Sequence, residues 1–599
     1  MEFAVLVKVV PAAESAKFDP VRKTIRRDEG ELFLNPFDQR ALRVALELRR
    51  PGETVTVVSM GPPAAASAVQ ETLALGVDRA ILVSDPILAG SDSLVTARVL
   101  ERVLAEHPAD LVLCGKWTTD SETGQVPAEL AELLGRPLVT AARRLVRSPV
   151  GDAFEVTVET ETGSARATFA APAVVSVGEK IAKPAKRAED GTAVPSLGNL
   201  LRIDAAQLGF AADEVGLRGS PTVVGALLDR EPRRIPVVFD DGAPEERVRR
   251  ALAALRTLLA RPSPEASRPD AGPVDRPPSG TAFVLVSDDR GRLDRGTLGT
   301  IAELRRIFPN VGVTALFAGD RIRPEEGEAL GSAGAGSVVV LSAALPVSAR
   351  GAATAVGHVM QREPEAIAGL FSSTMFGREV AGRVAARLGL GLTGDAVSIA
   401  CGPAGEVRYA KPAFGGGILA EISSRTRPAL ATVRSGSFAP RTSSGSVPVS
   451  VGSGPAVAPD ESLHWVGRDD DPDDGLPDPA SARIVVSIGV GATPMLPQVR
   501  AASARWGAAL VGTRRVVDAG VLPVARQVGL TGLWVAPQLG ILLGVRGSPN
   551  HLIAWRQARV LLAVNPDRTA PVLTGVDVGI VGTCEEILPL LVDEIPHLL

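Results

Sequence analysis

Residues 511–532 read VGTRRVVDAGVLPVARQVGLTG and residues 536–551 read APQLGILLGVRGSPNH, and this stretch decides the fold of the C-terminal part of the chain. AVNPD at 563–567 and GVDVGIVG at 575–582 follow. Apolar β-type runs alternate with glycine-rich turns, as in sheet domains that hold a large apolar ligand at their strand ends. Helix caps and turn glycines of any α/β domain would give a similar pattern. The turns carry the polar residues Arg514, Thr531, His551, Asn565 and Asp577.

A strand, a glycine turn and a helical pattern open the same domain upstream. The strand IVVSI at 484–488 leads into GVGATP at 489–494, and LPQVRAASARWG follows at 496–507. A glycine turn between a strand and a helix leaves backbone N–H groups free for phosphate oxygens. We therefore expect a Rossmann-like domain, with Gly489 and Gly491 facing the phosphates of a cofactor.

Short β-type runs also alternate with helical patterns at the start of the chain. This alternation predicts a doubly wound α/β domain, with a parallel sheet between two layers of helices. Such sheets bind ligands at the carboxyl ends of their strands. The runs are FAVLVKVV at 3–10, VTVVSM at 55–60, AILVS at 80–84 and DLVLC at 110–114.

The second half of the chain repeats landmarks of the first half. Gly135 follows VPAELAELL and Gly389 follows VAGRVAARL, 254 residues later. Pro172 in APAVVSV and Pro428 in RPALATV are 256 residues apart. The nearly constant offset predicts two copies of one domain, whereas chance similarity between two α/β units is the alternative.

Composition excludes several classes of protein. At 599 residues the chain is too long for one hydrophobic core. Its 64 Lys and Arg against 68 Asp and Glu give a net charge of −4, which argues against a nucleic acid partner. The cysteines Cys114, Cys401 and Cys584 have no CxxC or Cys/His spacing, so we expect no metal site and a cytoplasmic location. No apolar run reaches eighteen residues, so we expect no membrane insertion.

The ordered motifs of the whole chain resemble the electron transfer flavoproteins. Each motif is weak alone, but the set in this order is specific. The resemblance implies that the β and α subunits of that family are fused in one chain. The motifs are Asn35-Pro36-Phe37-Asp38, Gly61-Pro62, Cys114-Gly115-Lys116 through Gln125, Pro412-Ala413-Phe414-Gly415-Gly416 and Thr432-Val433-Arg434, together with the glycine turns described above.

The resemblance and the low-complexity segments together set the expected domain boundaries. Residues 1–260 resemble the β subunit with a C-terminal arm, and the Pro-rich residues 261–280 are expected to be a linker. Residues 281–440 resemble the N-terminal domain of the α subunit, and residues 441–480 are a second expected linker. Residues 481–599 resemble the FAD-binding domain. The implied fold is two duplicated doubly wound domains, similar to adenine-nucleotide α-hydrolases, plus a Rossmann-like domain.

By the same resemblance, the polar turn residues bind FAD. Arg514 would lie over the flavin ring, Thr531 near its reactive nitrogen and His551 near its pyrimidine carbonyl, while Asn565 and Asp577 would hold the adenosine. A fixed guanidinium charge favours the anionic, one-electron-reduced flavin. A surface arginine and a core histidine are the alternatives for Arg514 and His551. The remaining expected FAD-binding residues are Gly489, Gly491, Thr513, Gln527, Val528, Gly529, Arg546, Gly547 and Ser548.

Three positions depart from the pattern of the family. Val490 replaces an arginine of the phosphate turn, Leu530 replaces a glutamine, and Arg546 stands where a serine is usual. We expect backbone N–H groups after Gly491 to hold more of the diphosphate, and Arg546 to supply the missing charge.

A second nucleotide is expected in the first domain. Relatives hold AMP or a second FAD there, and the loop DSETGQV at 120–126 with Gly90, Asp92 and Thr96 resembles the two-flavin group. We therefore favour a second FAD and keep AMP as the alternative. Asp120 and Thr123 could instead be an ordinary helix cap and first-turn residue. The expected nucleotide-binding residues are Asn35, Asp38, Asp92, Thr96, Asp120, Thr123, Gln125 and Val126.

The sequence thus predicts an electron carrier between a donor dehydrogenase and an acceptor oxidoreductase, quinone- or ferredoxin-linked. The two-flavin reading leaves NADH oxidation with electron bifurcation open. A single-FAD carrier with AMP and a non-redox tandem nucleotide-binding protein are the alternatives. The Leu-Pro-Asn partner element of relatives is absent, because residues 180–187 read KIAKPAKR.

Overall fold

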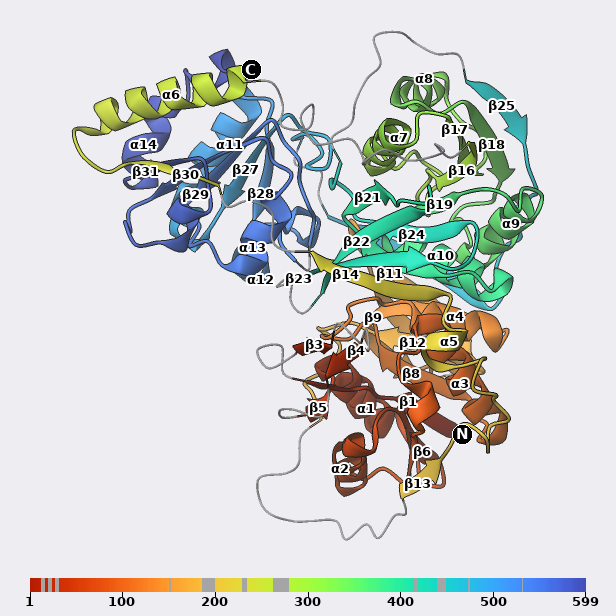
Figure 1. Cartoon of the computed structure of the whole chain (residues 1–599). Helices are drawn as coiled ribbons and strands as arrows, with labels where there is room; N and C mark the ends of the chain where they lie inside the picture. Colours follow the sequence, from red (N-terminus) through yellow and green to blue (C-terminus); the bar gives the residue numbers. More distant parts are fainter. Residues whose placement is uncertain are drawn as a thin grey trace.

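Figure 1 shows the computed structural model of the chain as three α/β units. The linker expected at 261–280 lies almost wholly outside the described residues. The structure describes residues 1–11, 32–149, 152–185, 200–228, 234–261, 279–413, 418–438, 449–471, 475–530 and 532–599, and the backbone alone of 17–19 and 24–26.

The first unit is built on a ten-stranded sheet. Its strand order is β13-β7-β6-β1-β8-β12-β9-β10-β11-β26, parallel from β13 to β9 and antiparallel beyond. The strands are β1 Glu2–Leu6, β6 Thr54–Met60, β7 Arg79–Val83, β8 Leu111–Gly115, β9 Leu138–Arg147, β10 Ala153–Thr160, β11 Gly163–Ala170, β12 Ala173–Val177, β13 Leu200–Ile203 and β26 Leu463–Asp470. The helices are α1 Pro36–Leu48, α2 Ala66–Glu71, α3 Ser93–Glu106 and α4 Val126–Leu133.

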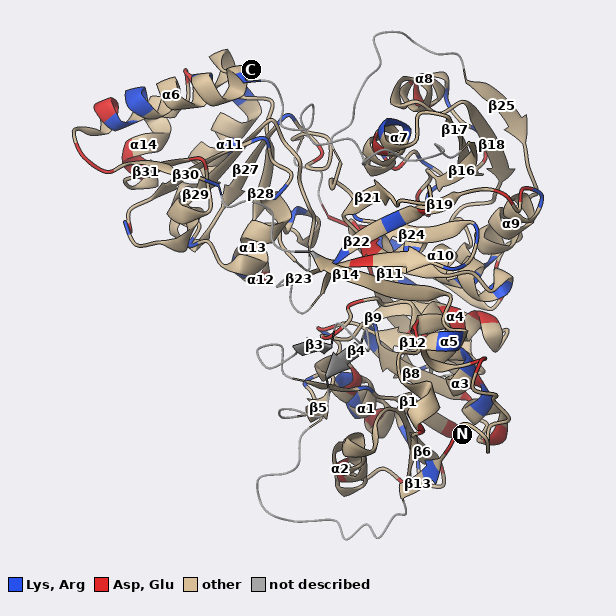
Figure 2. Ribbon diagram, viewed as in Figure 1, with Lys and Arg blue, Asp and Glu red and all other residues tan. Residues whose placement is uncertain are grey.

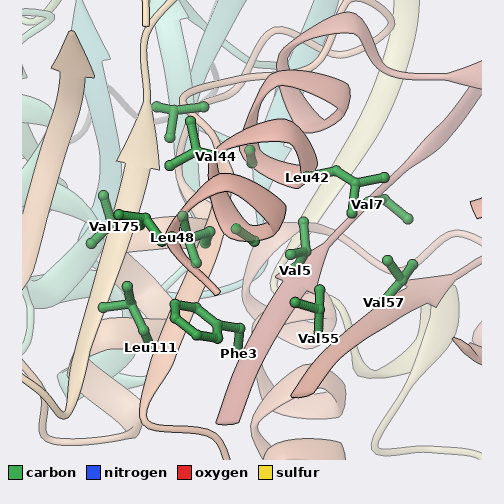
Figure 3. Packing of buried hydrophobic residues seen from close by; sticks show 14 of the residues in the cluster. Phe3, Val5, Val7, Leu42, Val44, Leu48, Val55, Val57, Leu111 and Val175 are labelled. Atoms are coloured by element: carbon green, nitrogen blue, oxygen red, sulfur yellow. The ribbon is translucent and has the colours of Figure 1, made fainter. Parts of the chain in front are cut away.

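Side chains of this sheet alternate between two hydrophobic layers. Phe3 and Val5 of β1 pack with Leu42 and Leu48 of α1 in one layer, which Figure 3 shows from close by. Ala4 and Leu6 point the other way, into a layer that α3 and α4 cover. Both faces are therefore buried, which confirms the expected doubly wound fold.

The second unit repeats this arrangement in a seven-stranded parallel sheet. Its order β20-β24-β19-β16-β17-β18-β25 matches β9-β12-β8-β1-β6-β7-β13, so the predicted duplication is confirmed. The strands are β16 Gly280–Leu285, β17 Val311–Gly319, β18 Ser337–Ser342, β19 Ala368–Ser372, β20 Leu392–Ala396, β24 Ala429–Val433 and β25 Ser450–Ser453. The helices are α7 Gly296–Ile307, α8 Pro324–Ala333, α9 Ala349–Gln361 and α10 Met375–Leu388.

Local details repeat as well. Gly135 and Gly389 follow α4 and α10 with φ of 64° and 67°, the left-handed backbone that glycine adopts at helix ends. Ala141 and Asp395 have φ of 54° and 56° in matching bulges, where Ser176 and Thr432 hydroxyls accept their N–H groups. The two repeats pack against each other through α4 and α10.

Strands are also exchanged between the units. β14 comes from the end of the first region but pairs with β23 of the second, and β26 returns from the second region to β11 of the first. The segment 441–480, expected to be a linker, therefore contributes β25 and β26 to the two sheets. The sheet that receives β14 has the order β14-β23-β22-β21, with β14 Thr222–Leu228, β21 Ser398–Cys401, β22 Val407–Ala413 and β23 Ile418–Ser424.

The third unit has a six-stranded parallel sheet in the order β15-β31-β30-β29-β27-β28. Its edge strand β15 and the helix α6, which lies along the unit in Figure 1, belong to the arm that was expected to end the first domain. The strands are β15 Val237–Phe239, β27 Ile484–Ile488, β28 Ala509–Gly512, β29 Leu539–Leu543, β30 Val560–Asn565 and β31 Val578–Val581. The helices are α6 Pro244–Ala260, α11 Leu496–Arg505, α12 Arg514–Asp518, α13 Pro549–Leu552 and α14 Cys584–Leu591.

The remaining described elements are short. Figure 2 shows basic and acidic residues interspersed over all three units. None of the helices in the described ranges is long and apolar enough to cross a bilayer. The short elements are β2 Val9–Pro11, β3 Lys17–Asp19, β4 Thr24–Arg26, β5 Leu32–Leu34, α5 Gly216–Gly219, η1 Pro63–Ala65, η2 Thr72–Leu75, η3 Pro86–Leu88, η5 Val490–Met495, η6 Val524–Arg526, η7 Ile553–Trp555, η8 Pro571–Thr574 and η9 Ile595–His597.

Candidate cofactor sites

Each sheet has one point where its strand order reverses. In the third unit β27 lies between β28 and β29, and in the first unit β1 lies between β6 and β8. On the two sides of such a point, the connections that follow neighbouring strands run to opposite faces of the sheet. This arrangement leaves a crevice at the carboxyl ends of the strands. These two crevices are where the structure brings most of the predicted residues together.

Glycine turns fill the crevice of the third unit. A Cβ on Gly489 would lie 2.1 Å from the Gly544 carbonyl oxygen, and one on Gly544 would lie 2.5 Å from the Ala492 nitrogen. A Cβ on Gly547, whose φ is 90°, would lie about as close to the Val572 nitrogen. A Cβ on Gly491 would also crowd the Gly544 carbonyl group. The turns after β27 and β29 therefore touch through bare backbone, which leaves their outer side for a phosphate-sized group.

Two of the three residues that depart from the family pattern lie beside these turns. Val490, the first residue of η5, is half exposed. The Arg546 side chain is exposed, and its charge helps to lower the pKa of Asp567, although the largest cause is a hydrogen bond from Thr569. The Arg546 guanidinium therefore lies close to the crevice but outside the packed turns.

His551 has the contacts of a buried core histidine, the alternative that the sequence left open. Its Nδ1 lies 2.9 Å from the Val528 carbonyl oxygen, and Trp555 Nε1 donates to its Nε2 at 3.2 Å. An indole nitrogen can only donate, so Nε2 accepts and Nδ1 carries the proton. Burial lowers the pKa of His551 to about 4, which keeps the ring neutral.

The turn at 527–530 lies beside His551. The Val528 N–H donates to the Gly512 carbonyl at the end of β28, and the Leu530 N–H donates to the Asn550 carbonyl at 2.7 Å. Gln527 follows η6, and Gly529 has φ of 151°. Ser548 precedes α13 and is exposed, whereas Thr531 lies outside the described residues.

Arg514 lies at the boundary between the third unit and the first. Thr513 precedes α12, and the Arg514 guanidinium donates from Nη2 to Glu179 Oε1 at 2.7 Å and from Nε to Asp518 Oδ2 at 3.3 Å. Its side chain is 48% exposed. Glu179 follows β12 of the first unit, and it is the main reason that the pKa of Arg514 is raised.

The structure separates Asn565 from Asp577. Asn565 ends β30 at the same edge as the glycine turns, where its amide donates to Val545 and its carbonyl accepts the Asp567 N–H. Asp577 precedes β31, at the opposite edge of this parallel sheet, and binds the Leu561 N–H and Arg234. The expectation that Asp577 joins the cofactor residues is corrected here, because the strand begins after it.

The residue at the cofactor edge of β31 is Thr583. It caps α14 by accepting the Glu586 N–H, and Gly582 just before it donates to the Asn565 carbonyl. The sequence signal was present in the capping pattern Thr583-x-x-Glu586 after the last strand, but we assigned the polar residue before the strand instead.

In the first unit, Asp38 ties the two central strands together. Its Oδ2 accepts the Lys8 N–H after β1 at 2.9 Å, and its Oδ1 accepts the Gly115 N–H at the end of β8 at 2.8 Å. Burial raises the pKa of Asp38 to about 7. Asn35 donates to the Trp117 carbonyl, and among the described residues its buried Oδ1 has no hydrogen-bond partner. That oxygen is open to a donor from a ligand.

Residues 116–125 form the loop between β8 and α4. Asp120 is buried there and binds Lys8 Nζ, with the Thr118 hydroxyl and the Ser121 N–H as further donors. Glu122 and Gly124 have φ of 50° and 62°, and Thr123 lies between them, partly buried. The backbone thus turns sharply within this loop.

Trp117 is a residue of this loop that sequence reasoning missed. Lys116 Nζ lies 4.3 Å from the centre of its ring, and Phe37 contacts it edge-on with centroids 5.8 Å apart. The signal was its rarity, because only five tryptophans occur in the chain. Together with Arg378 and Glu379 of α10, Lys116 and Trp117 line a pocket between the two repeats, which Gly124, Pro127, Ala128, Leu138, Thr140, Ser176 and Met375 complete.

Of the four other predicted residues, three make hydrogen bonds to protein groups away from the β1–β8 crevice. Asp92 caps α3 and accepts the Thr222 N–H and hydroxyl of β14, and Thr96 donates to the Asp92 carbonyl. Gln125 accepts from Ser93 and donates to the Leu392 carbonyl of the second repeat. Val126 begins α4.

Comparisons with known proteins agree with this architecture. The model of the electron transfer flavoprotein domain matches residues 23–197 and again residues 282–456. The model of the electron transfer flavoprotein FAD-binding domain matches residues 479–556. The two matches of one domain coincide with the two repeats, and the FAD-binding match covers the touching glycine turns.

Individual relatives each match about two fifths of the chain. The electron transfer flavoprotein subunit beta of Megasphaera elsdenii is 36% identical over 233 residues, covering 37% of this chain and 86% of that protein. Protein FixA of Azotobacter vinelandii is 34% identical over 268 residues, covering 43% of this chain and 95% of that protein. The subunit alpha of Mycobacterium leprae is 34% identical over 231 residues, covering 38% of this chain and 70% of that protein.

Proposed function

The chain belongs to the electron transfer flavoprotein family, with both subunits fused in one polypeptide, and on this premise we propose that it shuttles electrons from a dehydrogenase to a second oxidoreductase through FAD in the third unit. The observation that carries the proposal is the pair of touching turns, Gly489–Gly491 and Gly544–Gly547, at the reversal point of that sheet. A non-redox nucleotide-binding protein, the alternative from the sequence, is disfavoured by the family.

The residues of the third unit fit FAD. A phosphate would lie over the bare backbone of the glycine turns, close to the Arg546 guanidinium. Asn565 and Thr583, at the carboxyl edge of the sheet, would face the adenosine half. The turn at 527–530, with neutral His551 behind it, and Arg514 would border the ring. The flavin supplies one-electron chemistry when it is bound.

The charge of Arg514 sets how readily the site accepts electrons. A guanidinium remains protonated at any pH of interest, so it favours negative charge nearby. Glu179, 2.7 Å away in the first unit, offsets part of that charge. We therefore assign Glu179 a tuning role, in which contact between the units lowers the electron affinity of the flavin.

The first unit would hold a second adenine nucleotide, for which we favour FAD over AMP. Trp117 offers a face for stacking, and the free Asn35 Oδ1 offers an acceptor for a ribose hydroxyl or an adenine amino group. The curled loop 116–125 supplies backbone donors for phosphate oxygens. If AMP is bound instead, the same residues serve and the chain has one redox group.

A reductive titration tests the redox proposal. We expect the purified chain to be yellow, to lose its colour on titration with dithionite under anaerobic conditions, and to regain it with an electron acceptor. A colourless chain that gains no visible absorbance from added FAD would contradict the proposal. Rapid bleaching by NADH alone would support the further proposal of NADH oxidation, with bifurcation as its two-flavin form.

Arg546→Ala tests the phosphate assignment within the same site. We expect the variant to lose FAD at least tenfold faster on dilution or gel filtration, because it lacks a cation beside the turns. Arg568→Ala is the matched control, since Arg568 is exposed and pairs with Asp240 of the arm. Equal FAD retention in all three proteins would overturn the role of Arg546.

A further inference from the structure

Asp395 is a buried carboxylate held by two arginines. It lies in β20 of the second repeat and is 3% exposed. Its Oδ1 accepts from Arg378 at 2.7 and 3.1 Å, and its Oδ2 accepts from Arg434 at 2.9 Å. Burial alone would raise the pKa of Asp395, but the two guanidinium charges hold it well below its usual range. The carboxylate is therefore ionised in the interior.

One arginine leads from Asp395 to the third unit. Arg434 follows β24, and its Nη1 donates to the Leu530 carbonyl in the turn at 527–530. Its guanidinium also lies over the Trp534 ring, 5.6 Å from the centroid. Two contacts of one side chain thus hold the segment that would border the flavin ring.

The other arginine leads to the first unit. Arg378, in the first turn of α10, has its guanidinium carbon 5.7 Å from the centre of the Trp117 ring. Lys411 of β22 reinforces this side, because its ammonium donates to the Ser121 carbonyl and contributes to the low pKa of Asp395. Both contacts end in the loop 116–125, which would hold the second nucleotide.

The first repeat shows that the backbone does not require an aspartate here. Ala141 occupies the matching bulge with nearly the same φ, and its N–H is accepted by Ser176 as that of Asp395 is by Thr432. A buried carboxylate is costly unless it is fully paired. The Asp395 side chain therefore serves to bind the two arginines, and the bulge does not require it.

From these contacts we propose that Asp395 is a positioning residue that couples the nucleotide loop of the first unit to the flavin turn of the third unit. The inference rests on the proposed function, since it gives a role to the two cofactor sites. Asp395 fixes Arg378 and Arg434 at once, so a change at either loop reaches the other through a shared, fully paired carboxylate.

The test uses hydrogen exchange of the cofactor-loaded full chain. In Asp395→Asn, which keeps the left-handed backbone accessible but removes the charge, we expect amide exchange at least tenfold faster in both 116–126 and 527–535. Arg378→Lys should loosen mainly the first segment and Arg434→Lys mainly the second, but each should also loosen the other segment to a smaller extent, because both arginines share Asp395. Glu132→Gln is the matched control, because Glu132 also joins the repeats through Arg383 and Arg387 but, among the described residues, makes no contact that leads to the third unit.

A redox readout separates coupling from a purely structural role. Removing the negative charge should shift the flavin potential upward in Asp395→Asn and leave it unchanged in Glu132→Gln. The proposal is overturned if Asp395→Asn loosens one segment only, if neither segment changes, or if Glu132→Gln loosens both as strongly. If Asp395→Asn does not fold, the two lysine variants decide: faster exchange in the far segment as well as in the contacted one supports the coupling, and an effect on the contacted segment alone overturns it. Absence of flavin from the wild type would refute the proposed function instead.

Discussion

The two repeats have the same strand order but differ at the point where that order reverses. In the first repeat ten residues, 116–125, separate β8 from α4, which has 8 residues. In the second repeat only Ser373 and Thr374 separate β19 from α10, which has 14 residues. Both helices end before matching glycines, so the difference lies at their beginnings. The first repeat has opened the start of its helix into a loop.

What lies at each helix start explains the difference. In the second repeat Thr374 caps α10 by accepting the Gly377 N–H, and Glu161 of the first repeat accepts the Met375 N–H. Arg290 binds Thr162 next to Glu161, and Arg468 binds Asp289 at 2.6 Å. Protein groups thus cap the start of α10, while the first repeat would keep Trp117 and the Asn35 Oδ1 for a ligand. On the proposed function, the duplicated fold would therefore carry a nucleotide in only one of its two repeats.

The largest expected effect is the loss of stability when the aspartate at either reversal point, Asp38 or Asp294, is replaced. Asp38 accepts two buried N–H groups, whereas Asp294 accepts the Gly296 N–H and leaves its Oδ2 without a partner among the described residues. We expect Asp38→Ala to lower the free energy of unfolding at pH 5 by about 3 kcal/mol, and Asp294→Ala by about 1 kcal/mol. Urea denaturation measures both, and equal losses would break the comparison.

The pH dependence of the stability lost in Asp38→Ala sharpens the comparison. The folded-state pKa of Asp38 is raised from 3.8 to about 7, so the folded state keeps a proton that the unfolded state releases. The stability from this proton is present below pH 4 and is lost as the pH rises through 7. The cost of Asp38→Ala should therefore shrink by about 3 kcal/mol between pH 5 and pH 8. A cost that grows with pH in urea titrations would contradict the assignment.

Trp117 tests whether the open loop binds a nucleotide. Trp117→Ala removes a stacking interaction worth about 1–3 kcal/mol, so the first-unit nucleotide should bind roughly 5- to 150-fold more weakly while FAD in the third unit is retained. Trp465→Ala is the control, since that side chain is exposed on β26. Isothermal titration with AMP or FAD measures the affinity. Equal affinity of both variants and the wild type would mean that the loop is not the site.

The smallest effect concerns the residues that follow the last strand of each repeat. Glu179 after β12 pairs with Arg514, and Arg434 after β24 binds Leu530, so both repeats contact the third unit from matching places. Because the Glu179–Arg514 pair is half exposed, Glu179→Gln should cost only about 0.5 kcal/mol of stability. The flavin potential should rise, since Arg514 loses its counter-charge. A potential that falls in a spectroelectrochemical titration would contradict the tuning role.

Local patterns predicted much of the fold. Alternating strands and helices, and the landmarks Gly135 and Gly389, gave the doubly wound units and their duplication. The exchange of β14 and β26 could not be predicted, because an edge strand pairs through its backbone and leaves little mark in the sequence. The segment 441–480, expected to be a linker, instead places Asp469 and Asp470 beside Arg166 and Arg290.

Site residues were predictable only where a turn follows a strand. The glycine turns and Asn565 lie at the expected edge, but Asp577 was placed at the wrong end of its strand. The contacts of Asp38 join residues 30 and 77 positions away, which no local pattern encodes. The indole of Trp555 decides the tautomer of His551 from only four positions away, but the Val528 carbonyl beside Nδ1 is 23 positions away and no local pattern encodes it.

The most direct test is to denature the purified chain and count the FAD and AMP released per polypeptide. The account predicts two adenine cofactors, one in the third unit and one in the open loop of the first repeat, and both should be FAD. One FAD and one AMP would keep the two sites but contradict the two-flavin assignment. Three nucleotides, or none in the first repeat of a chain that retains FAD in the third unit, would contradict the central claim that only one of the two repeats is open.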